Sequence, residues 1–343
     1  MHVVVVGGGV LGCAAAYYVS TDPSTQVTVL EQDHSLACGA SGKAGGFLAL
    51  DWNDGTPLQE LSRRSFRLHQ QLASDLGASS VDFRAVDTFS LALSSGARKR
   101  LGNAATTAQV HPEKLCRRLA DIAESRGTRF LFNSRVTRIS LDEDKIRVVI
   151  GGEEGSVLEA DVIVLAMGPW SSVVSQWIPI ELDVVGEGYH SICLEADVAP
   201  EVLFLDQVED GSHPEVYPRP GGEVYVCGGI ARSDLPAQPS LAVPDDSSCD
   251  KLLNVAGRAS ERLKAVKVLK KQLCFLPVNR KSGLPVIESL ESFPNVFVAT
   301  GHSCWGILNA PATGEALAQL ILSGKSDLDL EAFKPRCGTS TFG

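Results

Sequence analysis

The first 31 residues constrain the fold of this chain more than any other segment. Four consecutive valines, Val3 to Val6, form the kind of β-branched run that a fully buried parallel strand needs. A glycine-rich turn follows, and residues 11–20 are small and apolar, which suits a helix that lies close to a sheet. Residues 26–31 have the composition of a second strand. The order strand, turn, helix, strand predicts a βαβ unit in a parallel sheet.

The turn carries the pattern G-x-G-x-x-G on Gly7, Gly9 and Gly12, between the predicted strand and the predicted helix. In this context Gly7 permits the tight turn, Gly9 lets the backbone approach a pyrophosphate, and Gly12 lets the helix pack close to the sheet. The helix begins at Val10 and Leu11, and its first turn offers free N–H groups and a positive dipole to phosphates. The pattern predicts a dinucleotide site; the alternative is a glycine turn of another α/β fold.

A carboxylate stands where the second predicted strand ends, at Glu31, and Gln32 follows it. A carboxylate at this place accepts hydrogen bonds from the ribose hydroxyls of adenosine and repels a 2′-phosphate, so NADP is disfavoured. The glycine pattern and Glu31 together support dinucleotide binding, but they do not distinguish FAD from NAD.

Two further segments favour FAD. The residues after the second strand are mostly small: Ser41, Gly42, Lys43, Ala44, Gly45 and Gly46. A simple NAD enzyme usually continues with another βα unit here, whereas this composition suits a backbone that runs beside a bulky ligand. Far along the chain, a predicted strand at 295–300 runs into a turn from Gly301 to Gly306 and then into a helix predicted over 313–323. This second helix start also faces the ligand, so we expect FAD.

The remaining patterns complete an α/β fold. We expect helices at 57–76, 111–125 and 249–264, strands at 81–100 and 161–166, a hairpin at 146–160, antiparallel strands over 184–230 and a surface loop at 235–248. This order predicts a Rossmann-type FAD-binding domain that is interrupted by an antiparallel-sheet substrate domain. The expected FAD-binding domain comprises residues 1–50, 105–183 and 271–330, and the expected substrate domain comprises residues 51–104 and 184–270.

Composition narrows the class of partner. The formal net charge of −10 does not favour binding to nucleic acid or to an anionic membrane surface. The nine cysteines are odd in number and contain no C-x-x-C pair, so we expect reduced thiols and no metal site. No apolar run reaches the ~18–20 residues that span a bilayer. We expect no leader before the first strand and no retention or peroxisomal signal in the tail at 335–343. We expect a cytoplasmic protein that acts on a small molecule.

Four motifs spread over nearly the whole chain resemble the D-amino-acid-oxidase (DAO) superfamily of FAD-dependent oxidoreductases. They are the glycine pattern with Glu31, residues 40–46, residues 161–171 with Trp170, and the G-H-x-x-W-G turn at 301–306. Glycine, sarcosine and related amine oxidases belong to this superfamily. Residues 41–65 and 304–309 most resemble a subgroup of fungal and plant oxidoreductases whose substrate is not settled.

The resemblance implies a role for each motif. It places Gly7, Gly9 and Gly12 at the pyrophosphate and Glu31 at the ribose, and it runs residues 41–46 along the ribityl chain and the flavin ring. It brings the backbone of Val136 to the adenine and lines the cofactor with Ala166 and Gly168. It surrounds the pyrimidine end of the ring with Gly301, His302, Gly306, Ile307 and Leu308, where a helix start favours negative charge on reduced flavin.

The resemblance also implies oxidation of a C–N bond by hydride transfer to the flavin, usually with oxygen as the final acceptor. Members that act on amino acids typically bind the substrate carboxylate with an arginine just before a proline. In this chain Leu276 stands there, before Pro277, and Glu288 stands where the family often has glycine. An ordinary amino-acid substrate is therefore in question, with Arg280 or Lys281 as weak substitutes.

Four residues are candidates for the catalytic side. Arg219 is either a partner for a substrate carboxylate or a solvated turn residue, and Tyr217 either caps the active site or is a half-buried strand aromatic. His302 is expected to contact the flavin rather than act as a base, and Trp305 is expected to pack against it. The alternatives to an oxidase are a flavin dehydrogenase with another electron acceptor and a non-catalytic flavoprotein that acts through a partner, for example in trafficking.

Overall fold

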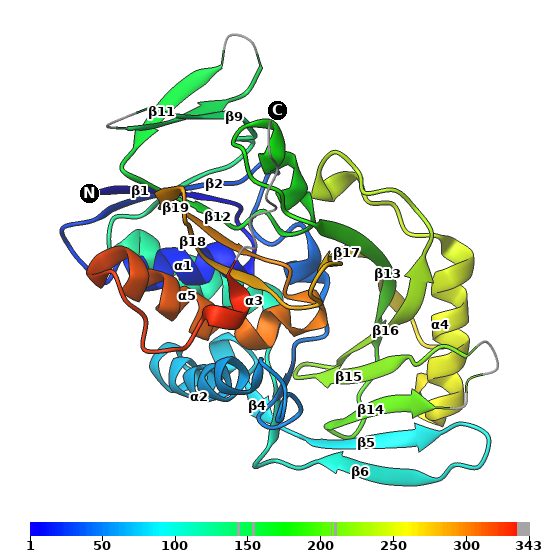
Figure 1. The fold of residues 1–343 in the computed structure, drawn as a ribbon. Helices are drawn as coiled ribbons and strands as arrows, with labels where there is room; N and C mark the ends of the chain where they lie inside the picture. The colour runs from blue at the N-terminus through cyan, green and yellow to red at the C-terminus, as the bar shows by residue number, and fades with distance from the viewer. Residues whose placement is uncertain (143–144, 153–154, 207, 209–210, 335–343) are drawn as a thin grey trace.

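The computed structural model describes residues 1–142, 145–152, 155–206, 208 and 211–334 (Figure 1). Its strands form one six-stranded sheet, one seven-stranded sheet and two three-stranded sheets. In Figure 1 the six-stranded sheet and its helices occupy the left of the molecule, and the seven-stranded sheet with α4 (Asp246–Ala259) occupies the right. The fold is therefore α/β, as the sequence predicts.

The six-stranded sheet contains the predicted βαβ unit. In order across the sheet, its strands are β18 (Val286–Leu290), β19 (Phe293–Thr300), β12 (Val162–Leu165), β1 (His2–Val6), β2 (Gln26–Leu30) and β8 (Arg129–Leu131). All neighbours are parallel except β18 and β19. Val3, Val4 and Val5 are completely buried, because both faces of the sheet are covered.

Each face of this sheet has its own hydrophobic layer. Val3 and Val5 pack with α1 (Val10–Val19), α3 (Pro112–Ser125) and α5 (Gly306–Ser323). Val4 and Val6 pack with the three-stranded sheet of β9 (Val136–Leu141), β10 (Ile146–Ile150) and β11 (Ser156–Ala160). The alternation of side chains along β1 thus divides the core into two layers.

The seven-stranded sheet forms the second half of the molecule. In order, its strands are β17 (Val268–Asn279), β13 (Val184–Glu195), β16 (Glu223–Ala231), β15 (Glu215–Arg219), β14 (Glu201–Asp206), β5 (Asp87–Ala92) and β6 (Arg98–Gly102). Its outer face packs on α4 through Val216, Val224 and Val226. Its inner face, with Tyr217 and Tyr225, packs on Phe47 of the small sheet formed by β3 (Phe47–Ala49), β7 (Thr107–Gln109) and β4 (Arg84–Ala85).

Several sequence-based boundaries differ from the structure. The helix α2 (Gln59–Leu76) was assigned to the substrate domain, but its Leu61, Phe66 and Leu68 join the core of the six-stranded sheet. The expected boundary at residue 271 falls inside β17, which pairs with β13 along its length. The loop expected at 235–248 ends early, because α4 begins at Asp246.

Three further expectations concern membrane-spanning helices, the cysteines and the tail of the chain. Among the described residues, no helix combines the length and the apolar character that crossing a bilayer requires. Each cysteine that the structure describes is a free thiol. The tail at 335–343, with Cys337, lies outside the described residues, so the structure does not address the expectation about its signals.

The last helix was predicted to begin at Thr313, and this is wrong: α5 begins at Gly306 and contains Pro311. Proline has no N–H, so it leaves the Ile307 carbonyl without its partner in the helix. Side chains of α2 repair this break. His69 Nε2 lies 2.9 Å from the Ile307 oxygen and 3.1 Å from the Leu308 oxygen, and Ser65 Oγ accepts a hydrogen bond from Ala312 N at 3.0 Å.

We predict that His69→Phe lowers the free energy of unfolding by about 1–3 kcal/mol, because it leaves the buried Ile307 carbonyl without a donor. His69→Gln is the matched control, since its amide still donates, and it should lose clearly less. Urea unfolding of the FAD-free protein measures both. Equal losses in the two variants would show that the hydrogen bond to α5 does not contribute.

Candidate functional site

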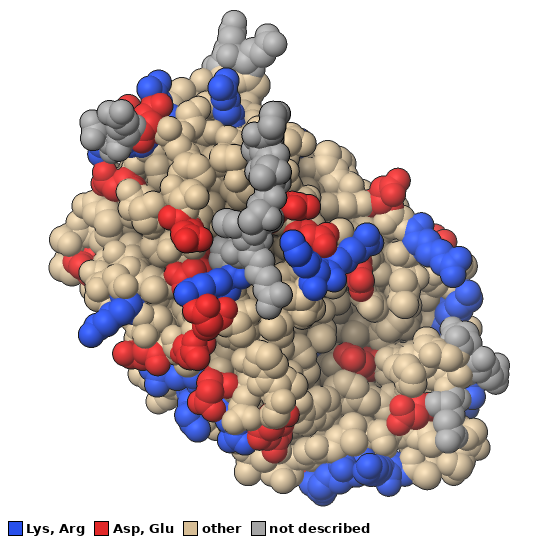
Figure 2. Space-filling view, viewed as in Figure 1, with Lys and Arg blue, Asp and Glu red and all other residues tan. Residues whose placement is uncertain are grey.

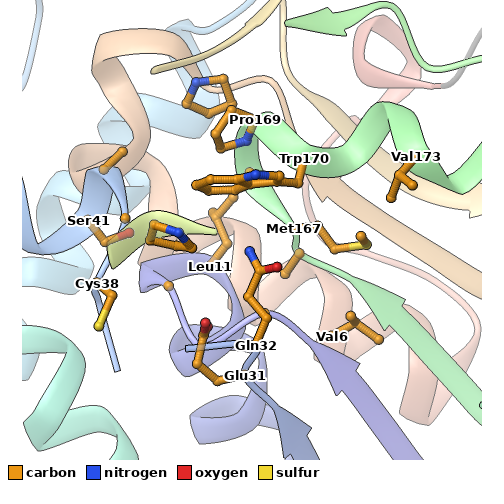
Figure 3. A pocket seen from close by; sticks show the side chains of 18 of the residues that line it. Val6, Leu11, Glu31, Gln32, Cys38, Ser41, Met167, Pro169, Trp170 and Val173 are labelled. Atoms are coloured by element: carbon orange, nitrogen blue, oxygen red, sulfur yellow. The ribbon is translucent and has the colours of Figure 1, made fainter. Parts of the chain in front are cut away.

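A cavity of about 680 Å³ lies where β1, β2 and β12 end (Figure 3). Open α/β sheets bind their ligands at the carboxyl ends of the strands, so this is the expected place for a cofactor. The cavity continues past the start of α5 to Leu276 and Pro277 on β17 of the seven-stranded sheet. One space therefore connects the dinucleotide turn with the second sheet.

Most of the predicted cofactor residues line this cavity. They are Gly7, Gly9, Val10, Leu11, Glu31, Gln32, Ser41, Ala44, Val136, Ala166, Gly168, Trp170, His302, Gly306 and Ile307. The predicted residues that do not line it are Gly12, Gly42, Lys43, Gly45, Gly46, Gly301 and Leu308, and the same holds for Tyr217, Arg219 and Trp305. Those residues can affect a bound cofactor only through the residues that line the cavity.

The glycine turn is shaped so that nothing fills the space before α1. Gly7 has φ +113°, and a Cβ there would lie 2.3 Å from the Ala166 oxygen. A Cβ on Gly12 would lie 1.8 Å from the Gly7 oxygen, so only glycine lets the helix approach the turn this closely. A Cβ on Gly9 would meet only Ser41 Oγ, at 3.1 Å. Gly9 thus borders open space at the helix start, which fits a pyrophosphate.

Glu31 is held at the end of β2 by two backbone N–H groups. Its Oε2 accepts from Gly8 N at 2.7 Å, and its Oε1 accepts from Asp33 N at 2.8 Å. Burial raises the pKa of this carboxyl, and the backbone N–H bonds oppose that effect. Each oxygen keeps a further lone pair, so the carboxylate can still accept from ribose hydroxyls. In Figure 3 Glu31 and Gln32 extend from the same strand end into the cavity.

The opposite wall includes residues that the sequence reading missed. Trp170 donates its indole N–H to the Pro236 oxygen at 2.7 Å, and the cavity is lined here by Leu235, Pro236 and Pro239. Composition marked residues 235–248 only as a surface loop, and no local signal shows that a loop folds back over a cavity. Figure 3 shows Trp170 and Pro169 across the space from Glu31.

The end of the cavity where the resemblance places the flavin ring is formed by residues around the start of α5. His302 is buried, and its Nε2 lies 3.0 Å from Thr313 Oγ1. Burial lowers its pKa to about 3, so the ring is neutral near pH 7 and cannot supply a positive charge. Ser303 and Cys304 also line the cavity, whereas Trp305 packs edge-on against Trp52 at 6.4 Å between ring centroids. These placements favour His302 as a wall residue.

Arg219 and Tyr217 lie on β15, behind the segment 41–46. Arg219 donates to Glu223 Oε1 at 2.5 Å and to the Ala44 oxygen at 2.9 Å, and its side chain is 4% exposed. The Tyr217 ring packs directly on Gly45, and its hydroxyl donates to Glu215. This guanidinium already pairs with protein groups, which argues against a carboxylate-binding role for Arg219. That role stays a prediction. Arg280 and Lys281 are exposed and do not line the cavity.

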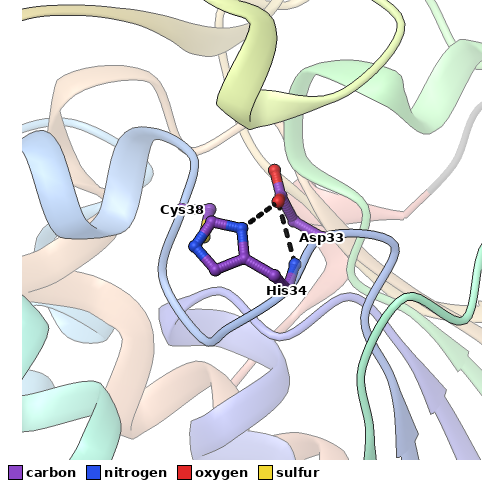
Figure 4. Close-up of side chains that lie close together, drawn as sticks. All are labelled: Asp33, His34 and Cys38. Atoms are coloured by element: carbon purple, nitrogen blue, oxygen red, sulfur yellow. Dashed lines mark hydrogen bonds and ion pairs between the residues drawn. The ribbon is translucent and has the colours of Figure 1, made fainter.

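Asp33, His34 and Cys38 lie close together beside the cavity (Figure 4). Carboxylate, imidazole and thiol groups are common metal ligands. Here Asp33 Oδ1 lies 2.7 Å from His34 Nδ1, and Asp33 Oδ2 accepts from Ser240 N at 2.7 Å. Both carboxylate oxygens therefore have partners within the chain, and Asp33 joins the cofactor loop to residues 239–241. The expectation of no metal site stays a prediction.

The glycine turn, the ribose carboxylate and the continuous cavity agree with comparisons to known proteins. A family model described as "FAD dependent oxidoreductase" (DAO) matches residues 2–108 and 103–320. The chain belongs to the DAO family of FAD-dependent oxidoreductases. It is 30% identical to C1F5.03c of Schizosaccharomyces pombe, a protein named as an oxidoreductase, over 94% of both chains. It is 24% identical to glycine oxidase of Bacillus licheniformis over 96% of both.

Solved structures show the same fold. Glycine oxidase from Geobacillus kaustophilus superposes with a TM-score of 0.85 at 19% identity, covering 97% of this chain and 98% of that one. L-proline dehydrogenase from P. horikoshii gives a TM-score of 0.81 at 18% identity, covering 97% of this chain and 96% of that one. These similarities support the two-sheet architecture, and the family supplies FAD as the cofactor.

We predict that Gly9→Ala weakens FAD binding at least tenfold and changes the stability of the FAD-free protein by about 1 kcal/mol or less. Its φ of −78° suits alanine, and within the protein the new methyl group meets only Ser41 Oγ, at 3.1 Å, beside the open space at the helix start. Gly12→Ala is the contrasting variant, because its Cβ strikes the Gly7 carbonyl, and we expect a stability loss of about 3 kcal/mol. FAD titration and urea unfolding separate the two effects. Equal FAD affinity of Gly9→Ala and wild type would contradict this assignment.

Because two histidines are buried, we predict that the folded protein loses stability in acid. The pKa of His69 is lowered to about 4 and that of His302 to about 3, both by burial. As the pH falls below about 6.5, the unfolded chain takes up these protons first, so the folded state loses stability down to about pH 4 through His69 and to about pH 3 through His302. Carboxyls with raised pKa values act in the opposite direction. We therefore compare wild type with His69→Gln at pH 7 and 5, and the variant should lose less stability; parallel losses would contradict the assignment.

Proposed function

We propose that this FAD-dependent oxidoreductase oxidises the C–N bond of a small amine, amino acid or related metabolite. The observation that carries the proposal is the continuity of the cavity, which runs from the glycine turn to Leu276 and Cys304 beside the second sheet. A cofactor that fills the turn would have its reactive ring at that far end, where a small substrate can reach it. FAD, when bound, accepts a hydride from the carbon that carries the nitrogen.

The named relatives favour this substrate class. Besides glycine oxidases, they include D-amino acid dehydrogenases that are 28% identical over 62% of this chain. The solved structures of similar fold include an iminodiacetate oxidase and an L-amino acid deaminase. Each of these names describes a reaction at carbon bonded to nitrogen. Oxidation of a C–N bond is therefore the reaction that the family relationship supports for this chain.

The residues at the ring end suit positioning more than proton transfer. His302 stays neutral, and Leu276 and Pro277 present apolar surface to the cavity. An amine that enters in its neutral form needs no protein base, because its own lone pair forms the C=N bond as the hydride leaves. We assign His302 and Trp305 to the structure of this end, and Tyr217 and Arg219 to positioning the segment 41–46.

The reduced flavin must pass its electrons to an acceptor, and two kinds of acceptor are alternatives. Both oxidases and dehydrogenases occur among the relatives, so transfer to oxygen and transfer to another acceptor are alternatives. A cytoplasmic location remains a prediction from the expected lack of targeting signals, and the absence of a nucleic-acid partner remains a prediction from the net charge.

The test is the visible spectrum of the purified protein, followed by anaerobic addition of pooled D-amino acids, N-methyl amino acids and simple amines. We expect flavin bands near ~370 and ~450 nm that one pool bleaches. Readmitting air should restore the bands quickly for an oxidase and slowly for a dehydrogenase. Bound flavin that no pool bleaches would contradict the proposed oxidation and favour a non-catalytic flavoprotein.

A further inference from the structure

Among the described residues, none that lines the flavin-ring end of the cavity carries a free positive charge. Its lining residues Leu276, Pro277, Ser303 and Cys304 are uncharged at neutral pH, and His302 is neutral. The nearby basic side chains have protein partners. Arg219 pairs with Glu223, Arg84 donates to the Pro218 oxygen, and Lys43 donates to the Leu273 oxygen at 3.0 Å. A substrate carboxylate would find no basic partner among these described residues.

A carboxylate without an ion-pair partner lies beside this end. Glu215 begins β15, and its side chain shares a sheet face with Phe204 and Cys227, its neighbours across the strands. It accepts hydrogen bonds from the Tyr217 hydroxyl and, at 3.6 Å, from the Cys227 thiol, both of which are neutral donors. No Lys or Arg of the described residues forms a salt bridge with it.

The position of Glu215 relative to the cavity follows from a chain of neighbouring side chains. Phe204 lies opposite Glu215 across the strands, and Trp52 contacts Phe204. Trp52 also contacts Trp305, which follows the cavity-lining Cys304 in the chain. Burial and, next, the charge of Glu215 raise the pKa of Cys304, which lines the cavity. Glu187 adds a second acidic group nearby, since it lies opposite Leu276 in the pairing of β13 with β17. Figure 2 shows this face hollowed near β13 and β15, with acidic rather than basic colour inside the hollow.

Aromatic rings border the same region. Phe204 lies 5.1 Å from Trp52 and 6.2 Å from Tyr217 between ring centroids, and Trp52 contacts Trp305. Of these rings only Tyr217 is fully buried, and the other three are partly exposed. Partly exposed rings beside a partly buried carboxylate can surround a cationic nitrogen, because the ring faces and the carboxylate both attract positive charge. The cationic nitrogen would also give the carboxylate of Glu215 a charged partner, which offsets the cost of removing the carboxylate from water.

We propose that Glu215 determines substrate specificity, and that the substrate is an amine that has a positively charged group besides the nitrogen at which oxidation occurs, and no carboxylate to be bound. The inference rests on the proposed oxidation of a C–N bond and names its substrate class. It follows from three features of the ring end: the apolar Leu276, the engagement of Arg219 by Glu223, and the unpaired Glu215 among aromatic rings.

The test measures binding without turnover. Benzyltrimethylammonium and benzoate are titrated into the FAD-loaded protein, and the shift of the flavin spectrum reports binding. We expect the cation to bind more tightly than the anion in the wild-type protein. Glu215→Gln keeps an acceptor for the Tyr217 hydroxyl but removes the charge, and it should weaken binding of the cation at least tenfold. The control is Glu195→Gln, which removes the charge of an exposed carboxylate at the last residue of β13. This variant should bind the cation like wild type.

The outcomes separate this proposal from the proposed oxidation. Benzoate binding as tightly as the cation in the wild-type protein would overturn the role of Glu215, and this comparison stands even if Glu215→Gln fails to fold. Unchanged cation affinity in a folded Glu215→Gln would overturn it as well. Bleaching by an amine together with Glu215-dependent cation binding supports both proposals. Cation binding that depends on Glu215, without bleaching by any amine, retains the binding site and rejects the oxidation.

Discussion

Hydrogen bonds from the start of α1 and from the seven-stranded sheet hold the segment 41–46, and the geometry of the cavity depends on them. On the side of the six-stranded sheet, Ser41 Oγ accepts from Val10 N at 2.9 Å. On the side of the seven-stranded sheet, the Lys43 oxygen accepts from the Tyr225 hydroxyl at 2.7 Å, and the Ala44 oxygen accepts from Arg219. The segment is therefore fixed to the glycine turn and to the second sheet at once. A cofactor beside this segment would lie against backbone that is fixed on both sides.

This arrangement gives Arg219 a structural task that its sequence context did not reveal. A buried guanidinium is costly unless it is paired, and Glu223 and the Ala44 carbonyl provide the pairing. Arg219 also stacks over the Tyr225 ring, with 5.0 Å between its Cζ and the ring centroid. Removing Arg219 would thus disturb the backbone beside the flavin even if the side chain never touches a substrate. Loss of activity on its substitution would not by itself show a catalytic role.

The parts of the fold that the sequence predicted correctly are those with a strong local cause. Consecutive valines, a glycine pattern between strand and helix, and an apolar helix each follow from nearby residues, and the βαβ unit formed as expected. The start of α5 was missed because the donors that satisfy Ile307 come from His69, far away in the chain. The wall at 235–239 was missed for a similar reason, since hydrogen bonds to residues far away in the chain, Trp170 and Lys43, hold that loop over the cavity.

The same distinction separates cofactor recognition from substrate recognition. The predicted FAD site is largely backbone at a turn whose glycines are fixed by close contacts, such as the 1.8 Å approach that forbids a Cβ on Gly12. The ring end is instead walled in part by side chains of another sheet, where exchanging one residue leaves the backbone unchanged. Leu276 occupies such a position on β17, and Glu215 lies behind the wall on β15. A change in the charge of the substrate site therefore need not alter the binding of FAD, and family membership fixes the cofactor more firmly than it fixes the substrate.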